Sequence, residues 1–231
     1  MVTDSVVTDS VLTDKADTMK STARRQFDDW AETYNQSFLH HFMFRPTYRV
    51  LLEELVAWRG EDATRFRVLD IGCGTGNLAG LFAGSSLPAR IIGLDYAPAM
   101  VRVARENAEK TGVDDDCTFL PGDSEHLPFA DASFDLITCS HSFHHYPHKQ
   151  ETVREMRRVL RPGGRLIIVD GFRDNAVGWF VFDVCITAVE KDVYHVPWSE
   201  MRELFLRAGL TDVRHRKFSW WFPLLMTMGT A

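Results

Sequence analysis

From residue 66 onward, short apolar segments alternate with amphipathic ones, and this alternation restricts the possible folds more than any other feature of the sequence. The apolar segments are rich in β-branched and aromatic side chains, as is typical of strands that are buried on both faces. The amphipathic segments carry helix signals, such as Pro98 at a helix start and Gly112 at a helix end. Strands that alternate with helices over short connections predict an α/β fold with a doubly wound, parallel sheet. We expect strands at 66–71, 90–95, 117–120, 134–140 and 165–170, and two closing strands at 212–218 and 221–228.

The sequence pattern divides the chain into three parts. Residues 1–18 repeat the motif Val-Thr-Asp-Ser-Val and contain no aromatic residue, so we expect a disordered tail there. Residues 19–60 place apolar side chains at helical spacing and are expected to form an N-terminal helical cap segment. Residues 61–231 are expected to form the main domain, with a helical cap insertion at about 171–200.

Composition excludes several classes of protein. The formal net charge of −6 argues against a surface that binds nucleic acid, because such surfaces carry an excess of basic residues. The four cysteines form no C-x-x-C pair, which indicates reduced thiols and a cytoplasmic protein. No apolar run approaches the roughly 18–20 residues that a transmembrane helix needs, and no secretory signal is recognisable. We therefore expect a cytoplasmic protein without a transmembrane segment.

Three loops that follow predicted strands carry side chains suited to a nucleoside. The first, residues 70–77, has three alternating glycines, which let the backbone turn tightly and approach a ligand closely. Asp95 ends the next strand, where a carboxylate can accept hydrogen bonds from ribose hydroxyls. Asp123 follows the third strand and can accept from the exocyclic amine of adenine. A dinucleotide loop would have a third glycine at the position of Asn77, so the pattern departs from that of nicotinamide enzymes.

Five motifs in order then resemble a known family. They are VLDIGCGTG (68–76), GLDYAPAM (93–100), GDSEHLPF (122–129), SFDLIT (133–138) and RVLRPGGRL (158–166). The series resembles the successive motifs of class I S-adenosylmethionine-dependent methyltransferases, in particular the branch with the ubiquinone and menaquinone C-methyltransferases. The resemblance covers about residues 60–171.

The resemblance implies a mostly parallel, seven-stranded sheet whose last strand is antiparallel, with S-adenosylmethionine as cofactor, S-adenosylhomocysteine as its product and no metal. In this arrangement Asp95 would hold the ribose, while Asp123 and Ser124 would read the adenine edge. Tyr34 lies in a stretch that closes over the cofactor in many relatives. The cofactor-binding residues that the resemblance implies are Tyr34, Asp70, Gly72, Cys73, Gly74, Asp95, Tyr96, Met100, Asp123, Ser124 and Ser140.

Histidines follow the fourth predicted strand, close to where the methyl group would lie. A phenol or a carbon acid would need a base with a pKa near 7, and histidine is the side chain whose ordinary pKa meets that need. We interpret His144 or His145 as a catalytic base or a group that orients the acceptor, and packing or helix capping is the alternative. A metal site formed by the histidines of this loop lacks a cysteine or an acid to complete its ligands.

Aromatic residues after the fifth strand suggest the kind of acceptor. They are numerous between residues 172 and 198 and could line an apolar pocket for a small apolar or aromatic metabolite. The apolar stretch 218–226 leaves open a peripheral contact with a membrane surface or a homodimer. Two other functions also stay open, namely a nicotinamide-dependent oxidoreductase and a non-catalytic scaffold that binds S-adenosylmethionine.

Overall fold

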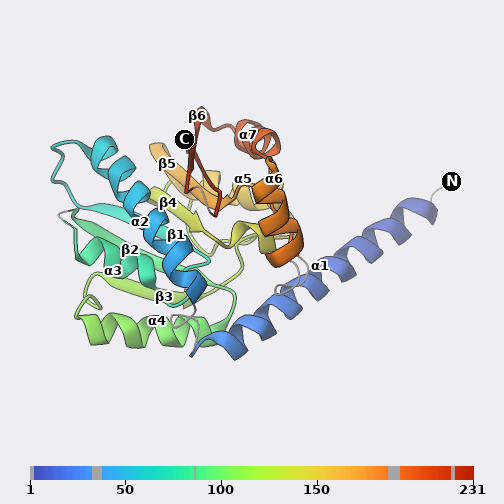
Figure 1. Ribbon diagram of the computed structural model, residues 1–231, viewed down its shortest axis with the longest axis horizontal. Coiled ribbons are helices and arrows are strands. Elements are labelled where there is room, and N and C mark those ends of the chain that lie inside the picture. The colour runs from blue at the N-terminus through green and yellow to red at the C-terminus, as the bar shows by residue number, and fades with distance from the viewer. Residues whose placement is uncertain (1–2, 33–37, 86, 187–192, 220–221) are drawn as a thin grey trace.

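The computed structural model describes residues 3–32, 38–85, 87–186, 193–219 and 222–231 (Figure 1). The strands are β1 (Phe66–Ile71), β2 (Ala89–Asp95), β3 (Cys117–Pro121), β4 (Phe134–Ser140), β5 (Leu160–Gly171), β6 (Thr211–Phe218) and β7 (Leu224–Thr230). The helices are α1 (Thr3–Trp30), α2 (Phe38–Arg59), α3 (Asn77–Ala83), α4 (Pro98–Thr111), α5 (Lys149–Val159), α6 (Ala176–Gly178) and α7 (Trp198–Arg207). A short 3-10 helix, η2 (Phe143–His145), and a π-helix, η3 (Trp179–Ile186), complete the described elements.

The strands form one seven-stranded sheet in the order β3-β2-β1-β4-β5-β7-β6. All neighbours from β3 to β5 are parallel, and β7 runs antiparallel to both β5 and β6. The expected α/β fold, with its last strand antiparallel, is therefore confirmed. The order reverses at β1, which has β2 on one side and β4 on the other. Ligands in such sheets bind outside the carboxyl ends of the strands at this reversal.

Both faces of the sheet are covered by helices, as its sequence pattern predicts. Neighbouring residues of β1 point to opposite faces, and both Val68 and Leu69 are fully buried. Val68 belongs to a core with Leu51 of α2 and Val101 of α4, whereas Leu69 belongs to a core with helices α5 and α7. The two cores hold the central strands rigidly, so the loops at their carboxyl ends have a fixed spacing.

Helix α1 begins at Thr3, within the segment for which we expected disorder. The structure differs from that expectation because residues 3–30 contain neither glycine nor proline, so nothing in the repeat interrupts a helix. Figure 1 shows the N-terminal part of α1 projecting away from the sheet, while its C-terminal part lies near α4. There Asp28 accepts a hydrogen bond of 3.1 Å from the backbone N–H of Ala99 in the first turn of α4. The domain boundaries at residues 18 and 60 stay predictions.

Two strands begin several residues away from the predicted position. β5 starts at Leu160, which pairs with Phe134, and a register shift follows before regular pairing with β4 resumes at Arg165. β7 starts at Leu224 because Pro223 has no N–H to contribute to a strand ladder, although its carbonyl accepts from Phe172. Among the helices that the structure describes, none has the length and apolar character needed to cross a lipid bilayer.

Candidate functional site

A cavity lies at the carboxyl ends of β1, β2 and β4, where the strand order reverses. It brings together residues from loops that are far apart in the sequence. The residues predicted to bind the cofactor that line it are Asp70, Gly72, Cys73, Gly74, Asp95, Tyr96, Met100, Asp123, Ser124 and Ser140. Tyr34, the remaining one, lies outside the described residues. The structure therefore assembles the predicted set in one place, and the role of each residue stays a prediction.

The glycine loop turns as its sequence requires. Gly72, Gly74 and Gly76 have φ values of 68°, 51° and 79°, in the left-handed region that favours glycine. A Cβ atom on Gly72 would lie 2.2 Å from Oγ of Ser142, so no larger residue fits there without rearrangement. A Cβ atom on Gly74 would meet nothing within 4 Å. The backbone at Gly74 is thus open to close approach by a ligand.

Two carboxyl groups face the cavity from the ends of β1 and β2. Burial raises the pKa of Asp70 to about 7, against the opposing effect of a hydrogen bond of 2.8 Å from Oγ1 of Thr138. Burial also raises the pKa of Asp95 to about 6, although the backbone N–H groups of Ala97 and Gly74 donate to it. A ligand that supplies positive charge or hydrogen-bond donors would favour the ionised form of both groups.

A third carboxylate, Asp123, has a partner that the sequence did not reveal. The ammonium of Lys20 in α1 donates to Oδ2 of Asp123 at 2.8 Å and to Oε2 of Glu125 at 2.6 Å. Burial alone would raise the pKa of Asp123, but the hydrogen bond and charge of Lys20 hold it below its usual value. Lys20 lies 103 residues before Asp123, and no local pattern connects them. Helix α1 therefore contributes a cation to the cavity wall.

The cavity is also lined by aromatic side chains and histidines. Phe27 of α1 and Phe44 and Tyr48 of α2 line it, together with His141 and His145. His141 directly follows β4 and has a φ of 56°, which is unusual for a residue other than glycine. Nε2 of His141 shares a hydrogen bond of 2.8 Å with Oγ1 of Thr47, a residue of α2. This bond ties the loop after β4 to the helix above the cavity.

The structure separates the two histidines that the sequence proposed together. His145 lines the cavity, where its ring contacts that of Phe27 edge-on at 5.0 Å. His144 lies behind it, and its Nδ1 is 2.7 Å from Oδ1 of Asp170. Asp170 was not predicted as a site residue, and His195 was expected only as part of the aromatic stretch that would line an acceptor pocket; neither residue lines this cavity. The position of Asp170 near the end of β5, at the same sheet edge as Asp70, is the signal that could have identified it.

The comparisons with known proteins agree with this geometry. Residues 69–168 match the family model described as a methyltransferase domain. The uncharacterized methyltransferase YcgJ of Bacillus subtilis is 43% identical over 112 residues, which are 48% of this chain and 43% of that protein. The ubiquinone/menaquinone biosynthesis C-methyltransferase UbiE of Bartonella tribocorum is 33% identical over 155 residues, or 66% of this chain and 58% of that protein.

A solved structure has the same fold. The crystal structure of the YcgJ protein of Bacillus subtilis matches with a TM-score of 0.65 at 24% identity, covering 79% of this chain and 98% of that one. The chain spans about half the length of the curated relatives that it matches. The resemblance inferred from the five motifs is confirmed by these similarities. Residues 69–168 of the chain therefore form a methyltransferase domain of the class I, S-adenosylmethionine-dependent kind.

Proposed function

We propose that the chain transfers the methyl group of S-adenosylmethionine to a small apolar or aromatic metabolite. The observation that carries this proposal is the composition of a single cavity. Carboxylates from the ends of β1 and β2 and from the loop after β3 line it together with aromatic and histidine side chains. The carboxylates suit a nucleoside with an amino-acid end, and the aromatic side chains suit an apolar acceptor.

The cofactor would lie along the strand ends. The backbone of Gly72 and Gly74 would meet the methionyl part, and the Asp70 carboxylate would lie near the ammonium of that part. Asp95 would accept hydrogen bonds from the ribose hydroxyls. Gly74 supports this arrangement, because its open face leaves room for a ligand against the backbone. The ammonium and the hydroxyls would supply the charge and the donors that favour the ionised form of both carboxyl groups.

The adenine would lie between β2 and the loop after β3. Tyr96 and Met100 would flank the ring, and Asp123 and Ser124 would receive its polar edge. Met100 is fully buried and Ser124 nearly so, and both line the cavity, which supports this placement. Ser140 at the end of β4 would lie under the methionyl group through its backbone.

Methyl transfer itself requires little from the protein beyond position. A methyl sulfonium is already electrophilic, so holding the acceptor in line at about 3–3.5 Å can supply roughly 7–11 kcal/mol of the barrier. An acidic acceptor would also need a base, and His145 is the predicted histidine that lines the cavity. His144 would act on the acceptor only through His145. The names of relatives support an aromatic acceptor, because the UbiE protein is a C-methyltransferase of ubiquinone and menaquinone biosynthesis.

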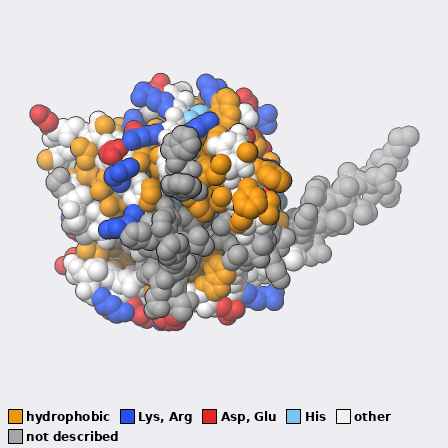
Figure 2. All heavy atoms as spheres, viewed as in Figure 1, with side chains coloured by type: hydrophobic (Ala, Val, Ile, Leu, Met, Phe, Trp, Pro, Cys, Tyr) orange, Lys and Arg blue, Asp and Glu red, His pale blue; other side chains and the backbone are white. Residues whose placement is uncertain are grey.

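The chain also has an exposed apolar surface. Val177, Trp179, Phe180 and Val184, in α6 and η3, each expose 41–56% of their surface, and Figure 2 shows hydrophobic side chains gathered over these elements. Such a surface supports contact with a membrane or with a second copy of the chain. Sedimentation of the protein with and without anionic lipid vesicles separates the two partners.

The first experiment measures binding of S-adenosylhomocysteine by isothermal titration calorimetry. We expect Asp95→Ala to weaken binding at least tenfold, as loss of a charged hydrogen-bond acceptor does. Asp115→Ala removes an exposed carboxylate after α4, and it should bind like the unchanged protein. Absence of binding by the unchanged protein would reject the proposal, and a rise in thermal stability with NAD(P) alone would favour an oxidoreductase.

The second experiment identifies the acceptor. Metabolite extracts are incubated with the protein and S-adenosylmethionine, and mass spectrometry searches for products that gain one methyl group. A methylated product that forms only when the protein and S-adenosylmethionine are both present identifies the acceptor. Tight binding of the cofactor without any methylated product would instead indicate a scaffold.

A further inference from the structure

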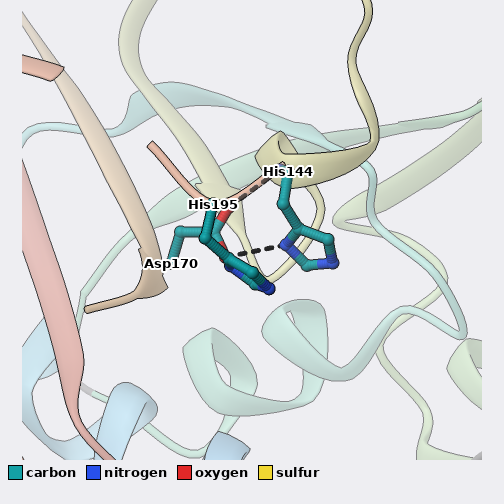
Figure 3. A group of neighbouring side chains, drawn as sticks. All are labelled: His144, Asp170 and His195. Atoms are coloured by element: carbon teal, nitrogen blue, oxygen red, sulfur yellow. Dashed lines mark hydrogen bonds and ion pairs between the residues drawn. The ribbon is translucent and has the colours of Figure 1, made fainter. Parts of the chain in front are cut away.

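A buried carboxylate near the end of β5 is surrounded by donors from two histidines. Oδ2 of Asp170 accepts from the backbone N–H of His144 at 2.8 Å, and Oδ1 lies 2.7 Å from Nδ1 of the same residue. Oδ1 also accepts from the backbone N–H of Gly171 at 2.8 Å and lies 3.3 Å from Nδ1 of His195 (Figure 3). All three side chains expose 6% or less of their surface. The group is therefore shielded from water.

Two histidines and a carboxylate also form a set that could hold a metal ion. Their ligand atoms lie within 4.8 Å of one another. However, both oxygens of Asp170 already receive hydrogen bonds from backbone N–H groups, and a cation would have to displace the Nδ1 contact of His144. The arrangement is better suited to accepting hydrogen bonds than to coordinating a metal.

The contacts of Asp170 define which nitrogen of His144 carries a proton. Burial would raise the pKa of Asp170, but the charges and hydrogen bonds of His144 and His195 hold it well below its usual value. An ionised carboxylate can only accept, so Nδ1 of His144 must donate to it. In the neutral form of the ring, Nε2 is then the nitrogen without a proton, and its lone pair points away from Asp170. Because the same carboxylate also holds the backbone N–H of His144, both the ring and its peptide are fixed.

The ring of His144 belongs to a series of ring contacts that ends in the cavity. Phe182 of η3 contacts His195 with ring centroids 4.6 Å apart, and His195 contacts His144 at 4.4 Å. His144 contacts His145 at 4.2 Å, and His145 meets Phe27 of α1 at 5.0 Å. His145 is thus held between a buried imidazole and an aromatic ring. A change at Asp170 would reach the cavity through a single intervening ring.

We propose that Asp170 is a positioning residue that orients His144, and that His144 and His195 together support His145 as it faces the methyl acceptor. This inference rests on the proposed function, since it concerns the side chain that would meet the acceptor. His195 comes from the segment between η3 and α7, so the support also connects this segment to the end of β5.

The test begins with the unchanged protein saturated with S-adenosylhomocysteine. Nitrogen-15 NMR of labelled histidines distinguishes a ring protonated at Nδ1 from one protonated at Nε2. We expect His144 to carry its proton at Nδ1. A proton at Nε2 instead would overturn the proposal, and this measurement needs neither an acceptor nor a variant.

Asp170→Asn then tests the dependence on the carboxylate. The amide is equal in size, but its NH₂ group can only donate, so we expect a substantial fraction of His144 to move its proton to Nε2. The initial rate at which labelled methyl is transferred from S-adenosylmethionine to molecules in a metabolite extract should fall about 10–100-fold. Losses of this size occur when the hydrogen-bond partner of a metal-binding histidine is removed in other enzymes. The affinity for S-adenosylhomocysteine should stay within about twofold. A purely structural role would change the affinity together with the rate.

Two further variants control the comparison. Asp135 is the second residue of β4 and lies at the end of that strand far from the cavity, where its carboxylate also accepts a hydrogen bond. Asp135→Asn should alter neither the tautomer of His144 nor the rate of methyl transfer. His195→Phe retains a ring in the series and leaves Asp170 in place, so the His144 tautomer should persist. An unchanged tautomer and rate in Asp170→Asn would overturn the proposal, as would loss of the tautomer in His195→Phe. Micromolar binding of Zn²⁺ that Asp170→Asn abolishes would also overturn it, in favour of a metal site.

Failure of the proposed function would look different. A protein that does not bind S-adenosylhomocysteine, yet has His144 protonated at Nδ1, would retain the buried support and lose the methyl-transfer proposal. Binding of S-adenosylhomocysteine by a protein whose His144 carries its proton at Nε2 would keep the methyl-transfer proposal and reject the role of Asp170.

Discussion

Cofactor binding should release protons, because two carboxyl groups that line the cavity are partly protonated in the free protein near neutral pH. Burial raises the pKa of Asp70 to about 7 and that of Asp95 to about 6. In the proposed complex, the ammonium of the cofactor lies by Asp70, and ribose hydroxyls donate to Asp95. Both interactions favour ionised carboxylates, so the bound state holds fewer protons than the free state. Binding should therefore weaken as the pH falls.

The size of the effect follows from the two pKa values. At pH 6.0, roughly 0.9 proton on Asp70 and about 0.5 on Asp95 would be released, or about 1.4 in total. At pH 7.5 the release falls to about 0.3 proton. Integration between these values makes S-adenosylhomocysteine bind about 15-fold more weakly at pH 6.0 than at pH 7.5.

Calorimetry in buffers with different enthalpies of ionisation measures the proton release directly, since the observed heat varies with the buffer in proportion to it. Asp70→Asn retains an oxygen for the hydrogen bond from Thr138 but cannot titrate. In this variant the release at pH 6.0 should fall to about 0.5 proton, and the affinity ratio between the two pH values to about twofold. Tight binding at pH 6.0 with a heat that is independent of the buffer would refute the reasoning.

Two further predictions concern the glycine loop and helix α1. Gly72→Ala should destabilise the protein in urea unfolding by more than the roughly 1–2 kcal/mol that a left-handed backbone costs, because its Cβ would lie 2.2 Å from Oγ of Ser142. Gly112 has nearly the same φ as Gly72 but has open space where a Cβ atom would lie. If Gly112→Ala lost as much unfolding free energy as Gly72→Ala, the steric argument would be contradicted. Lys20→Met should make S-adenosylhomocysteine bind about tenfold more tightly, because it frees Oδ2 of Asp123 for the adenine amine. Weaker binding by this variant, measured by the same calorimetry, would show that the ammonium assists the cofactor.

The parts of the molecule that could be predicted from the sequence are those with local causes. The strand β1 and the loop after it depend on an apolar run followed by glycines, and the observed strand Phe66–Ile71 has the bounds that were expected. The same holds for the helix that starts at Pro98 and ends before Gly112. The family resemblance added the antiparallel direction of the last strand, which periodicity alone does not determine.

The parts that could not be predicted depend on contacts between distant segments. Lys20 reaches Asp123 only because α1 lies against the cavity, and the polar repeat at the start of α1 pointed to disorder instead. Asp170 was placed in a strand without a role, because its significance comes from His144 and His195. The sequence indicated the histidine pair, but it could not separate His145, which lines the cavity, from His144, which does not.

The distribution of charge around the cavity fits the electrostatics of methyl transfer. The positive charge of a sulfonium disappears in the reaction, so a carboxylate beside the sulfur would stabilise the reactant more than the transition state and slow transfer. In the proposed arrangement, Asp95 and Asp123 serve the ribose and adenine, and Asp70 the ammonium. Asp170 does not line the cavity, and its charge is used in hydrogen bonds to His144. An acceptor approaching past Phe27 and Phe44 would then meet the imidazole ring of His145 rather than an anion that competes for the sulfonium.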